Sequence, residues 1–209
     1  MPPSAALLAQ RLQGLNIYLV GMMGSGKSSV GRPLAEALGY RFVDADQLLE
    51  QASGRTIPEI FADAGEQGFR DLETQVLDAL SPWQRSVVAT GGGVVLRPVN
   101  WGHLRQGVVI WLDAPESLLL QRLRQDPTAR PLLAQPDPEQ RLHQLLEERR
   151  PLYAQADLHL QQQADDSPAA VAAQLLEALP GILREPSLAA PMGAIELRDA
   201  EGQRRDAIN

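Results

Sequence analysis

The sequence predicts an α/β fold built on a parallel sheet with helices on both faces. Along the 209 residues, short apolar runs alternate with helical patterns, which is typical of successive β-α-β units. The runs are continuously apolar rather than alternating, as in strands that are covered on both sides. A glycine-rich loop follows the first run and opens a helix, which is the usual position of a phosphate-binding loop. The expected strands span residues 17–20, 41–43, 87–90, 108–112 and 157–160.

Helical patterns fill the intervals between the expected strands. They cover residues 27–38, 46–52, 57–64, 67–80, 115–125 and 138–149. A last helix begins after Ser167, a natural N-cap followed by proline, and ends at Pro180 and Gly181. We therefore expect an N-terminal extension over residues 1–14 that forms a short helix, a domain over 15–184, and a flexible tail over 185–209 that lacks any sustained periodicity.

Composition and charge exclude several classes of function. The formal net charge is -7, so the overall field repels nucleic acid and anionic membranes, and any polyanion needs a local basic site. The chain has no cysteine, which excludes disulfides, thiolate nucleophiles and cysteine-ligated metals, and its three histidines are scattered. The apolar run near the N-terminus is short and interrupted by Arg11. We expect a cytoplasmic monomer with no signal peptide and no membrane span.

The stretch GMMGSGKSSVG at residues 21–31 contains the only lysine of the chain. Gly21, Gly26, Lys27 and Ser28 match the phosphate-binding pattern G-x-x-x-x-G-K-[ST] between an expected strand and an expected helix. Glycines allow backbone N–H groups to surround phosphates, and the lysine adds a compact charge that the wider arginine fork would not fit. The serine hydroxyl can bind a magnesium ion that bridges the phosphates. The alternative is a tight turn with a solvated lysine.

Two carboxylates, Asp44 and Asp46, follow the second expected strand within FVDAD. In open α/β sheets, ligands bind at the carboxyl ends of the strands. Alternation along an extended chain would place both carboxylates on one side, where one can support magnesium through water and the other can accept a hydrogen bond from an alcohol. Alternatively, Asp46 only caps the helix that follows.

Arg70 lies in the helical stretch that also contains Glu66 and Glu73. The spacing allows an ordinary exposed ion pair at i−4 or i+3, which would have no role in binding. Thr90 and the three glycines at 91–93 follow the third expected strand. They are compatible with a plain flexible turn, or with a ligand that lies directly on backbone N–H groups.

A proline-rich segment, DPTARPLLAQPDP at residues 126–138, connects two expected helices. It is either an inert connection or a mobile lid that brings Arg130 to a transferred phosphoryl group. Arg149 lies near the end of the next helix in RRPLY, where an arginine also interacts favourably with the helix dipole. These residues alone do not decide between the alternatives.

The order of five elements resembles the shikimate kinases, a family of small P-loop kinases. The elements are GMMGSGKSSVG, FVDAD, FRDLE, TGGG, and RPLL followed by RRPLY, and the resemblance covers residues 15–180. It implies a three-layer α/β/α P-loop kinase fold with a five-stranded parallel sheet of order 2-3-1-4-5 and a mobile lid over about 126–138, with a substrate-binding region over about 44–75. It also implies ATP-dependent phosphorylation of the 3-hydroxyl of shikimate, on the route to chorismate and the aromatic amino acids.

The resemblance also implies the roles of individual residues. Lys27, Asp46 and Arg130 would be catalytic. Asp46 would hold the reacting hydroxyl, Asp44 would support Mg²⁺ through water, and Glu73 would orient Arg70. ATP would be bound by Gly24, Ser25, Gly26, Lys27, Ser28, Ser29 and Arg130, with Ser28 also on the metal. Shikimate would be bound by Asp46, Arg70, Gly91, Gly92, Gly93 and Arg149.

Several alternatives stay open from the sequence. The family stacks an arginine on adenine, and either Arg122 or Arg124 fits the spacing. A gluconate or nucleotide kinase shares the fold, although TGGG, RPLL and RRPLY argue against both. A non-catalytic module that only binds a nucleotide or shikimate should lack the catalytic carboxylate or the lid arginine, and Asp46 and Arg130 are both present.

Overall fold

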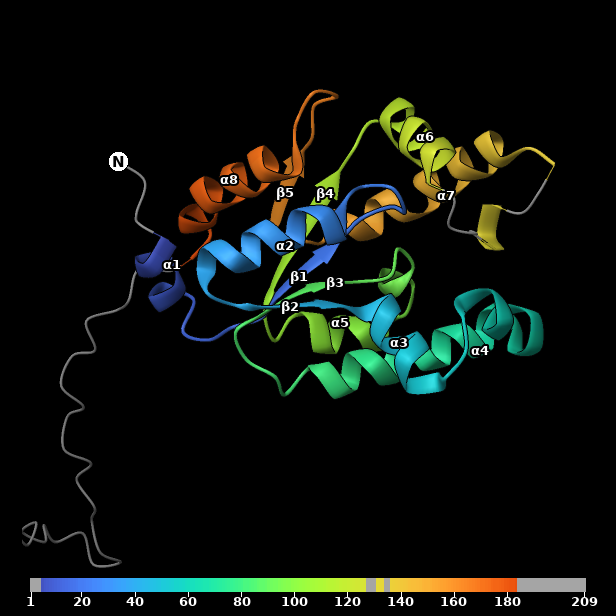
Figure 1. Cartoon of the computed structure of the whole chain (residues 1–209), viewed down its shortest axis with the longest axis horizontal. Coiled ribbons are helices and arrows are strands. Elements are labelled where there is room, and N and C mark those ends of the chain that lie inside the picture. The colour runs from blue at the N-terminus through green and yellow to red at the C-terminus, as the bar shows by residue number, and fades with distance from the viewer. Residues whose placement is uncertain (1–4, 127–130, 134–135, 184–209) are drawn as a thin grey trace, which may run out of the picture.

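A five-stranded parallel sheet forms the centre of the protein in the computed structural model, which describes residues 5–126, 131–133 and 136–183 (Figure 1). The strand order is β2-β3-β1-β4-β5, so the order expected from the sequence resemblance is confirmed. The strands are β1 Ile17–Val20, β2 Arg41–Asp44, β3 Ser86–Ala89, β4 Val108–Asp113 and β5 Leu158–Gln161. Each predicted strand is present within one or two residues of its expected ends.

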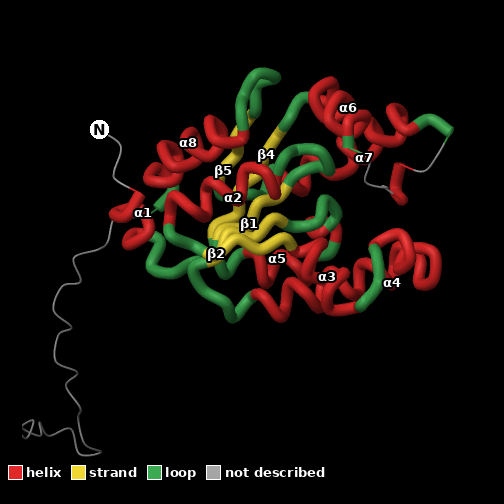
Figure 2. Tube along the Cα trace, in the orientation of Figure 1, coloured by secondary structure: helices red, strands yellow, loops and turns green. Residues whose placement is uncertain are grey.

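Helices connect the strands and cover both faces of the sheet (Figure 2). The α-helices are α1 Ala5–Arg11, α2 Lys27–Leu38, α3 Ala45–Ser53, α4 Ile57–Leu80, α5 Pro98–Leu104, α6 Glu116–Gln125, α7 Pro138–Tyr153 and α8 Pro168–Ala178. Three short 3-10 helices complete the described chain: η1 Val94–Leu96, η2 Pro131–Leu133 and η3 Leu179–Gly181.

Two of the apolar core clusters lie against the sheet, one on each face. On one face, α1, α2 and α8 pack against the sheet around Leu19 and Ile110, which are fully buried. On the other face, α4, α5 and the end of α7 pack around Val20 and Trp111. Because β1 and β4 are buried on both faces, all their positions are apolar up to Asp113, as the continuous runs predicted.

The strand pairing brings three loops to one edge of the sheet. β1 pairs with β3 and β4, and β3 also pairs with β2, all in parallel. The loops that follow β1, β2 and β3 therefore emerge side by side, although they lie about 20 to 70 residues apart in the chain. These loops are the glycine-rich loop, the FVDAD segment and the TGGG turn.

Several element boundaries differ from the expectations. α3 begins at Ala45, directly after β2 and one residue before the expected start, so Asp46 lies within the first turn of the helix. α4 runs without a loop but breaks at Gly65, whose φ of 65° and ψ of -173° are not helical, and this explains why the pattern suggested two helices. α5 was not predicted, and α7 continues to Tyr153 with Pro151 in its last turn.

The N-terminal helix α1 belongs to the main core. Leu8 and Leu12 are fully buried against the α2 and α8 face, and Arg11 donates to the carbonyl oxygens of Pro180 at 3.4 Å and Leu183 at 3.0 Å. The short helix expected in this region is therefore present and ties the two ends of the domain together. In the described part of the chain, no helix combines the length and apolarity needed to cross a membrane.

Candidate active site

The glycine-rich loop wraps the N-terminus of α2 and holds the chain's single lysine. Gly26 takes a left-handed conformation with φ of 84°, and a side chain on Gly21 would lie 2.5 Å from the carbonyl oxygen of Leu112. Lys27 is the first residue of α2, and its Nζ donates to the carbonyl oxygens of Gly21 at 2.9 Å and Met22 at 3.0 Å. The loop thus keeps its ammonium group over the helix N-terminus, where phosphates bind.

This loop borders the first of two pockets, with a volume of about 490 Å³. Arg122, Gln162 and Pro168 also line this pocket. Arg122 Nη1 donates to the carbonyl oxygen of Gly24 and to Gln162 Oε1, both at 3.2 Å, and burial lowers its pKa. Arg124 instead lies on the surface in an ion pair with Glu139. Of the two arginines left open by the spacing, only Arg122 lines the pocket.

Ser28, Asp44 and Asp46 lie where this pocket meets a second one. Ser28 Oγ donates to Asp44 Oδ2 at 2.5 Å. Asp44 Oδ1 also accepts from the backbone N–H groups of Asp46 and Gln47, so Asp44 is the N-cap of α3. Asp44 and Asp46 both line both pockets, so they lie on one side as expected. The reason given, strand alternation, is wrong, because Asp46 lies in the first turn of α3. The alternative in which Asp46 caps the helix is also wrong, because Asp44 does so.

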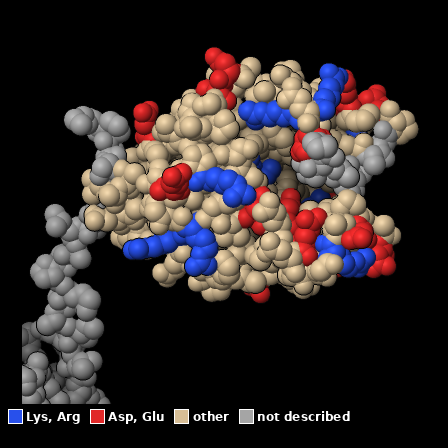
Figure 3. Space-filling view, viewed as in Figure 1, with Lys and Arg blue, Asp and Glu red and all other residues tan. Residues whose placement is uncertain are grey.

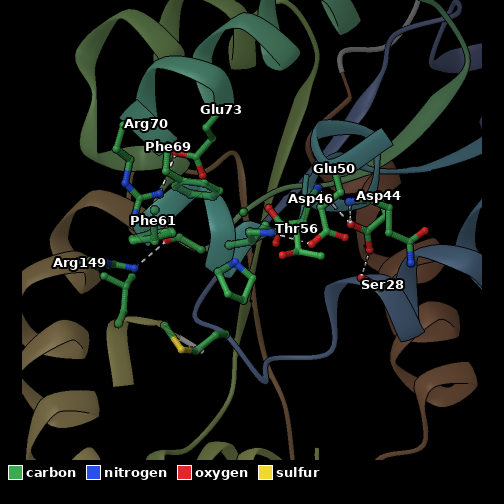
Figure 4. A pocket seen from close by; sticks show the side chains of 18 residues that line it. Ser28, Asp44, Asp46, Glu50, Thr56, Phe61, Phe69, Arg70, Glu73 and Arg149 are labelled. Atoms are coloured by element: carbon green, nitrogen blue, oxygen red, sulfur yellow. Dashed lines mark hydrogen bonds and ion pairs between the residues drawn. The ribbon is translucent and has the colours of Figure 1, made fainter. Parts of the chain in front are cut away.

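The second pocket has a volume of about 550 Å³ and opposite charges at its two ends (Figure 4). Arg70 and Arg149 lie together at one end, and Asp44, Asp46 and Glu50 lie at the other. The space-filling view shows acidic and basic side chains gathered around a hollow between the α3–α4 region and the α6–α7 region (Figure 3). Such a pocket suits a small molecule with an anionic group on one side and hydroxyl groups on the other.

Arg70 is buried between two carboxylates of its own helix. Its Nη1 lies 2.9 Å from Glu73 Oε2 and its Nη2 lies 3.1 Å from Glu66 Oε1, with 6% of the Arg70 side chain exposed. Burial alone would lower the pKa of Arg70, but the two carboxylates raise it. Burial raises the pKa of Glu73, and the attraction of Arg70 opposes that rise. The ion pairs expected from the spacing exist, but Arg70 is not an exposed helix arginine.

Arg149 is a buried cation without an ion-pair partner among the described residues. It is 2% exposed, and its Nη1 donates to the carbonyl oxygen of Gly92 at 3.3 Å. The hydroxyl of Tyr153 donates to the same oxygen. The neighbouring Arg150 points elsewhere, toward Asp113 at 3.4 Å. Because a buried charge is costly unless it is paired, Arg149 is prepared to receive an anion in the pocket.

Two of the three glycines of the TGGG turn, Gly91 and Gly93, lie directly against these charged side chains. A side chain on Gly93 would lie 2.2 Å from the guanidinium of Arg70, and one on Gly91 would lie 2.4 Å from Glu73 Oε1. A side chain on Gly92 would lie 3.3 Å from the backbone nitrogen of Met23. The turn therefore brings its backbone against the charged groups and is not a plain flexible connection.

The two pockets share a short set of residues: Met23, Ser28, Asp44, Asp46 and Gly92. A group bound in the first pocket and a group bound in the second therefore meet at these residues, and two of them are carboxylates. This is the geometry needed for transfer of a group between two ligands.

The structure brings together nearly all of the residues singled out in the sequence. Those lining one or both pockets are Gly24, Gly26, Lys27, Ser28, Ser29, Asp44, Asp46, Arg70, Glu73, Gly91, Gly92, Gly93 and Arg149. Ser25 is fully buried beneath the loop. Arg130 and part of the expected lid lie outside the described residues, although Leu132 of the RPLL element lines the second pocket.

Sequence reasoning missed several residues of the two pockets. Gln162 is 1% exposed and donates to the carbonyl oxygen of Ser25 at 2.8 Å, but it lies in a polar QQQ run with no distinguishing signal. Phe61 and Phe69 form an apolar wall, with ring centroids 4.7 Å apart. The chain contains only three phenylalanines, and two of them, Phe61 and Phe69, lie in the helix that carries Arg70. This clustering was the signal available in the sequence.

Comparison with known proteins gives one consistent family. Residues 23–180 match the family model described as shikimate kinase. A shikimate kinase of Synechococcus sp. (strain RCC307) is 60% identical over 179 residues, which cover 86% of this chain and 91% of the relative.

Solved structures agree with the sequence matches. A shikimate kinase from Acinetobacter baumannii, solved in complex with shikimate, is 41% identical and aligns over 83% of this chain and 97% of its own, with a TM-score of 0.78. A shikimate kinase from Bacteroides thetaiotaomicron is 31% identical over 79% of this chain and 98% of its own, with a TM-score of 0.74.

Proposed function

We propose that this chain, which belongs to the shikimate kinase family, phosphorylates the 3-hydroxyl of shikimate with ATP by using the two adjoining pockets described above. The observation that best supports this proposal is the arrangement of charged residues in the second pocket. This pocket has two buried arginines at one end and meets the phosphate-binding loop at two carboxylates on the other. The chain is an enzyme, a phosphotransferase with an alcohol acceptor.

Arg70 and Arg149 form the clamp for the carboxylate of the acceptor. Arginine forks match a planar carboxylate, and the lack of a carboxylate partner for Arg149 among the described residues supports this role. Glu73 and Glu66 hold Arg70 in place, and the backbone at Gly91–Gly93 faces the acceptor. This local positive site explains how a chain of net charge -7 binds an anionic substrate.

The first pocket binds ATP. The backbone of the glycine-rich loop and Lys27 hold the phosphates, and we assign Arg122 and Pro168, which line the same pocket, to the adenine ring. Ser28 and Asp44 present oxygen donors beside the phosphate site, which suits a hard cation, so they would hold Mg²⁺, directly and through water respectively. When bound, this ion neutralises charge on the phosphates.

Transfer occurs where the pockets meet. Asp46 accepts a hydrogen bond from the reacting hydroxyl and takes its proton as the oxygen bonds to the γ-phosphorus. The bond to the bridging oxygen breaks, and ADP leaves with the electron pair. Lys27 stabilises the charge that develops on the phosphoryl oxygens, and we assign the same function to Arg130 from the lid. The two pockets contribute further to the rate by aligning the hydroxyl with the γ-phosphorus.

We further propose that the chain acts as a cytoplasmic monomer in which residues 15–184 carry the catalytic site, although the folded unit also includes helix α1. Helix α1 contributes to its core rather than to the site, since Leu8 and Leu12 lie in the cluster around α2 and α8. No role is assigned to residues 185–209, which fall outside the described chain.

Release of ADP with ATP and magnesium tests the assignment, with shikimate, gluconate, nucleoside monophosphates and no acceptor compared in parallel. We expect turnover only with shikimate, and its loss when EDTA removes the metal. Equal turnover with gluconate, or ATP binding without turnover on any acceptor, would contradict the proposal.

A further inference from the structure

Arg97 connects the turn that follows the three glycines to the helix that carries Arg70. Its Nη2 lies 2.7 Å from Asp71 Oδ1 and 3.5 Å from the carbonyl oxygen of Gln67, and its Nη1 lies 3.3 Å from Thr74 Oγ1. The guanidinium of Arg97 thus contacts three acceptors on successive turns of α4. Arg97 lines neither pocket, and no part of the proposed mechanism uses it.

One of these contacts continues to the main chain of Arg70. Thr74 Oγ1 accepts from Arg97 and donates to the carbonyl oxygen of Arg70 at 3.0 Å. The hydrogen-bond network formed by Arg97 and Thr74 therefore reaches the backbone of Arg70, whose guanidinium lines the acceptor pocket. Its acceptors on α4 are Gln67, Asp71 and Thr74, which line neither pocket, so it does not compete with the ligand.

The other end of the network is rigidly held. Asn100 Nδ2 donates to the carbonyl oxygen of Val94 at 2.8 Å, and Trp101 Nε1 donates to that of Val95 at 3.1 Å. Asn100 is fully buried and Trp101 is 6% exposed, so η1 and α5 form one packed unit. Arg97 is the residue between η1 and α5, and it fixes α4 against this unit.

The contacts of Arg97 with α4 matter for two reasons. There is little free space between the TGGG turn and Arg70, and α4 is interrupted close to these contacts. Gly93 approaches the Arg70 guanidinium so closely that a methyl group would not fit between them. α4 departs from helical geometry at Gly65, two residues before the Gln67 contact, and the segment beyond the break carries part of the pocket wall. Misplacement by about 1 Å can reduce a reaction rate about 100-fold.

We propose that Arg97 is a positioning residue that sets the distance between the TGGG turn and α4, and thereby the geometry of the carboxylate clamp. This inference rests on the proposed role of Arg70. The ion pair with Asp71 would by itself contribute little, because the Asp71 side chain is 56% exposed. The contribution of Arg97 comes from contacting three acceptors over about two turns of α4, which the single ammonium of lysine cannot do.

Steady-state kinetics of Arg97→Ala, Arg97→Lys and Thr74→Val, with both substrates varied, test the proposal. We expect Arg97→Ala to raise the KM for shikimate about 5- to 10-fold and to leave the KM for ATP within about twofold of wild type. Thr74→Val keeps the shape of the side chain and removes the relay, so it should raise the KM for shikimate by a smaller factor. Arg97→Lys should restore only part of the loss.

Two further variants separate the possible explanations. Arg105→Ala is the matched control, because Arg105 is an exposed arginine at the end of α5 that contacts Gln155 and packs on Trp101, away from both pockets. It should leave both KM values unchanged. Arg70→Lys reports on the clamp itself and should raise the KM for shikimate more than Arg97→Ala does.

The outcomes are distinguishable. If Arg70→Lys raises the KM for shikimate and neither Arg97→Ala nor Thr74→Val does, the positioning role is overturned and the clamp stands. A parallel rise in both KM values with a lower melting temperature would also overturn it, because general destabilisation would then explain the effect. If Arg70→Lys has no effect, the clamp itself is wrong and the inference falls with it. Should Arg97→Ala fail to fold, Thr74→Val and Arg97→Lys decide the question by the same criterion.

Discussion

The two pockets are built in different ways. The nucleotide pocket takes its phosphate-binding part from one continuous loop, Gly21–Ser29, and uses its backbone and a single lysine. The acceptor pocket takes its charged groups from α3, α4 and α7, with Arg70 and Arg149 far apart in the chain. Local geometry is sufficient for the phosphate-binding part of the first pocket, whereas the charged groups of the second depend on the packing of whole elements.

The two pockets also differ in the partners of their basic side chains. Lys27 is held by backbone carbonyl oxygens at the N-terminus of α2, where it can move toward phosphates. In the acceptor pocket, Arg70 is compensated by Glu73 and Glu66, while Arg149 has only neutral partners among its hydrogen bonds in the described chain. A change in the nucleotide pocket should therefore reduce turnover, and a change in the acceptor pocket should reduce affinity for shikimate.

The largest effect is expected from Lys27→Ala. Loss of the charge on the transferring phosphoryl group should lower kcat by at least about 1,000-fold, while the fold and shikimate binding persist. Lys27→Arg keeps the charge but should also lose activity, because the loop is shaped around a narrow ammonium group. Single-turnover kinetics and shikimate titration by calorimetry measure the two effects. Near-normal kcat in either variant would contradict the assignment.

Asp46→Asn, at the junction of the pockets, should lower kcat by about 100- to 10,000-fold. The unfolding transition should stay close to that of wild type, because Asp44 and not Asp46 caps α3. Steady-state assays and circular dichroism would be run on the same preparation. Asp44→Asn is the informative comparison, since it should affect both magnesium dependence and helix stability.

Arg149→Lys should raise the KM for shikimate by about 10- to 100-fold, because a bidentate contact to a carboxylate is lost from a buried site. The KM for ATP should change little. Arg150→Lys provides a matched control in the adjacent residue, which is half exposed and pairs with Asp113. An equal rise in the KM for shikimate in Arg149→Lys and Arg150→Lys would contradict the role of Arg149 in the clamp.

Gly93→Ala should raise the KM for shikimate about 5- to 10-fold, since a methyl group would displace the Arg70 guanidinium. Gly102→Ala in α5 is the control, because a side chain there meets nothing within 4 Å. Both variants add one methyl group, so kinetics and melting temperatures can be compared directly. An unchanged KM in Gly93→Ala would show that Arg70 has freedom to shift.

The smallest effect concerns Tyr153, which is buried beside Arg149, at alkaline pH. Burial raises the pKa of Tyr153 from 10.0 to about 12. Because the folded-state pKa is the higher one, the stabilisation is complete below about pH 10 and is lost as the pH rises toward 12. At pH 11, the free energy of unfolding should have fallen by about 1 kcal/mol more in wild type than in Tyr153→Phe. Urea unfolding at pH 8 and pH 11 measures this difference, and equal losses would contradict it.

The sequence predicted the phosphate-binding loop well because its features are local. Glycines at fixed offsets, a preceding strand and a following helix specify one backbone path, and Lys27 lies where that path requires. The strands were predicted for a similar reason, since burial on both faces makes them continuously apolar. The chemistry of the acceptor pocket came from resemblance to a family rather than from local pattern.

Tertiary structure decided which member of each similar pair enters the site. Arg122 lines the nucleotide pocket and Arg124 pairs with Glu139 on the surface, although the two lie only two residues apart. Arg149 points to Gly92 while the adjacent Arg150 points to Asp113. The direction of a side chain depends on how its helix is rotated against distant elements, and one sequence without those elements does not contain that rotation.

The sequence by itself thus determined the fold class, the strands and the phosphate-binding loop, because apolar periodicity and glycine spacing act over a few residues. Only the tertiary structure decided that Arg122 rather than Arg124 lines the nucleotide pocket, that Arg149 is buried without a carboxylate partner in the described chain, and that Arg97 reaches the backbone of Arg70. These properties depend on contacts between segments that the chain brings together only when it folds.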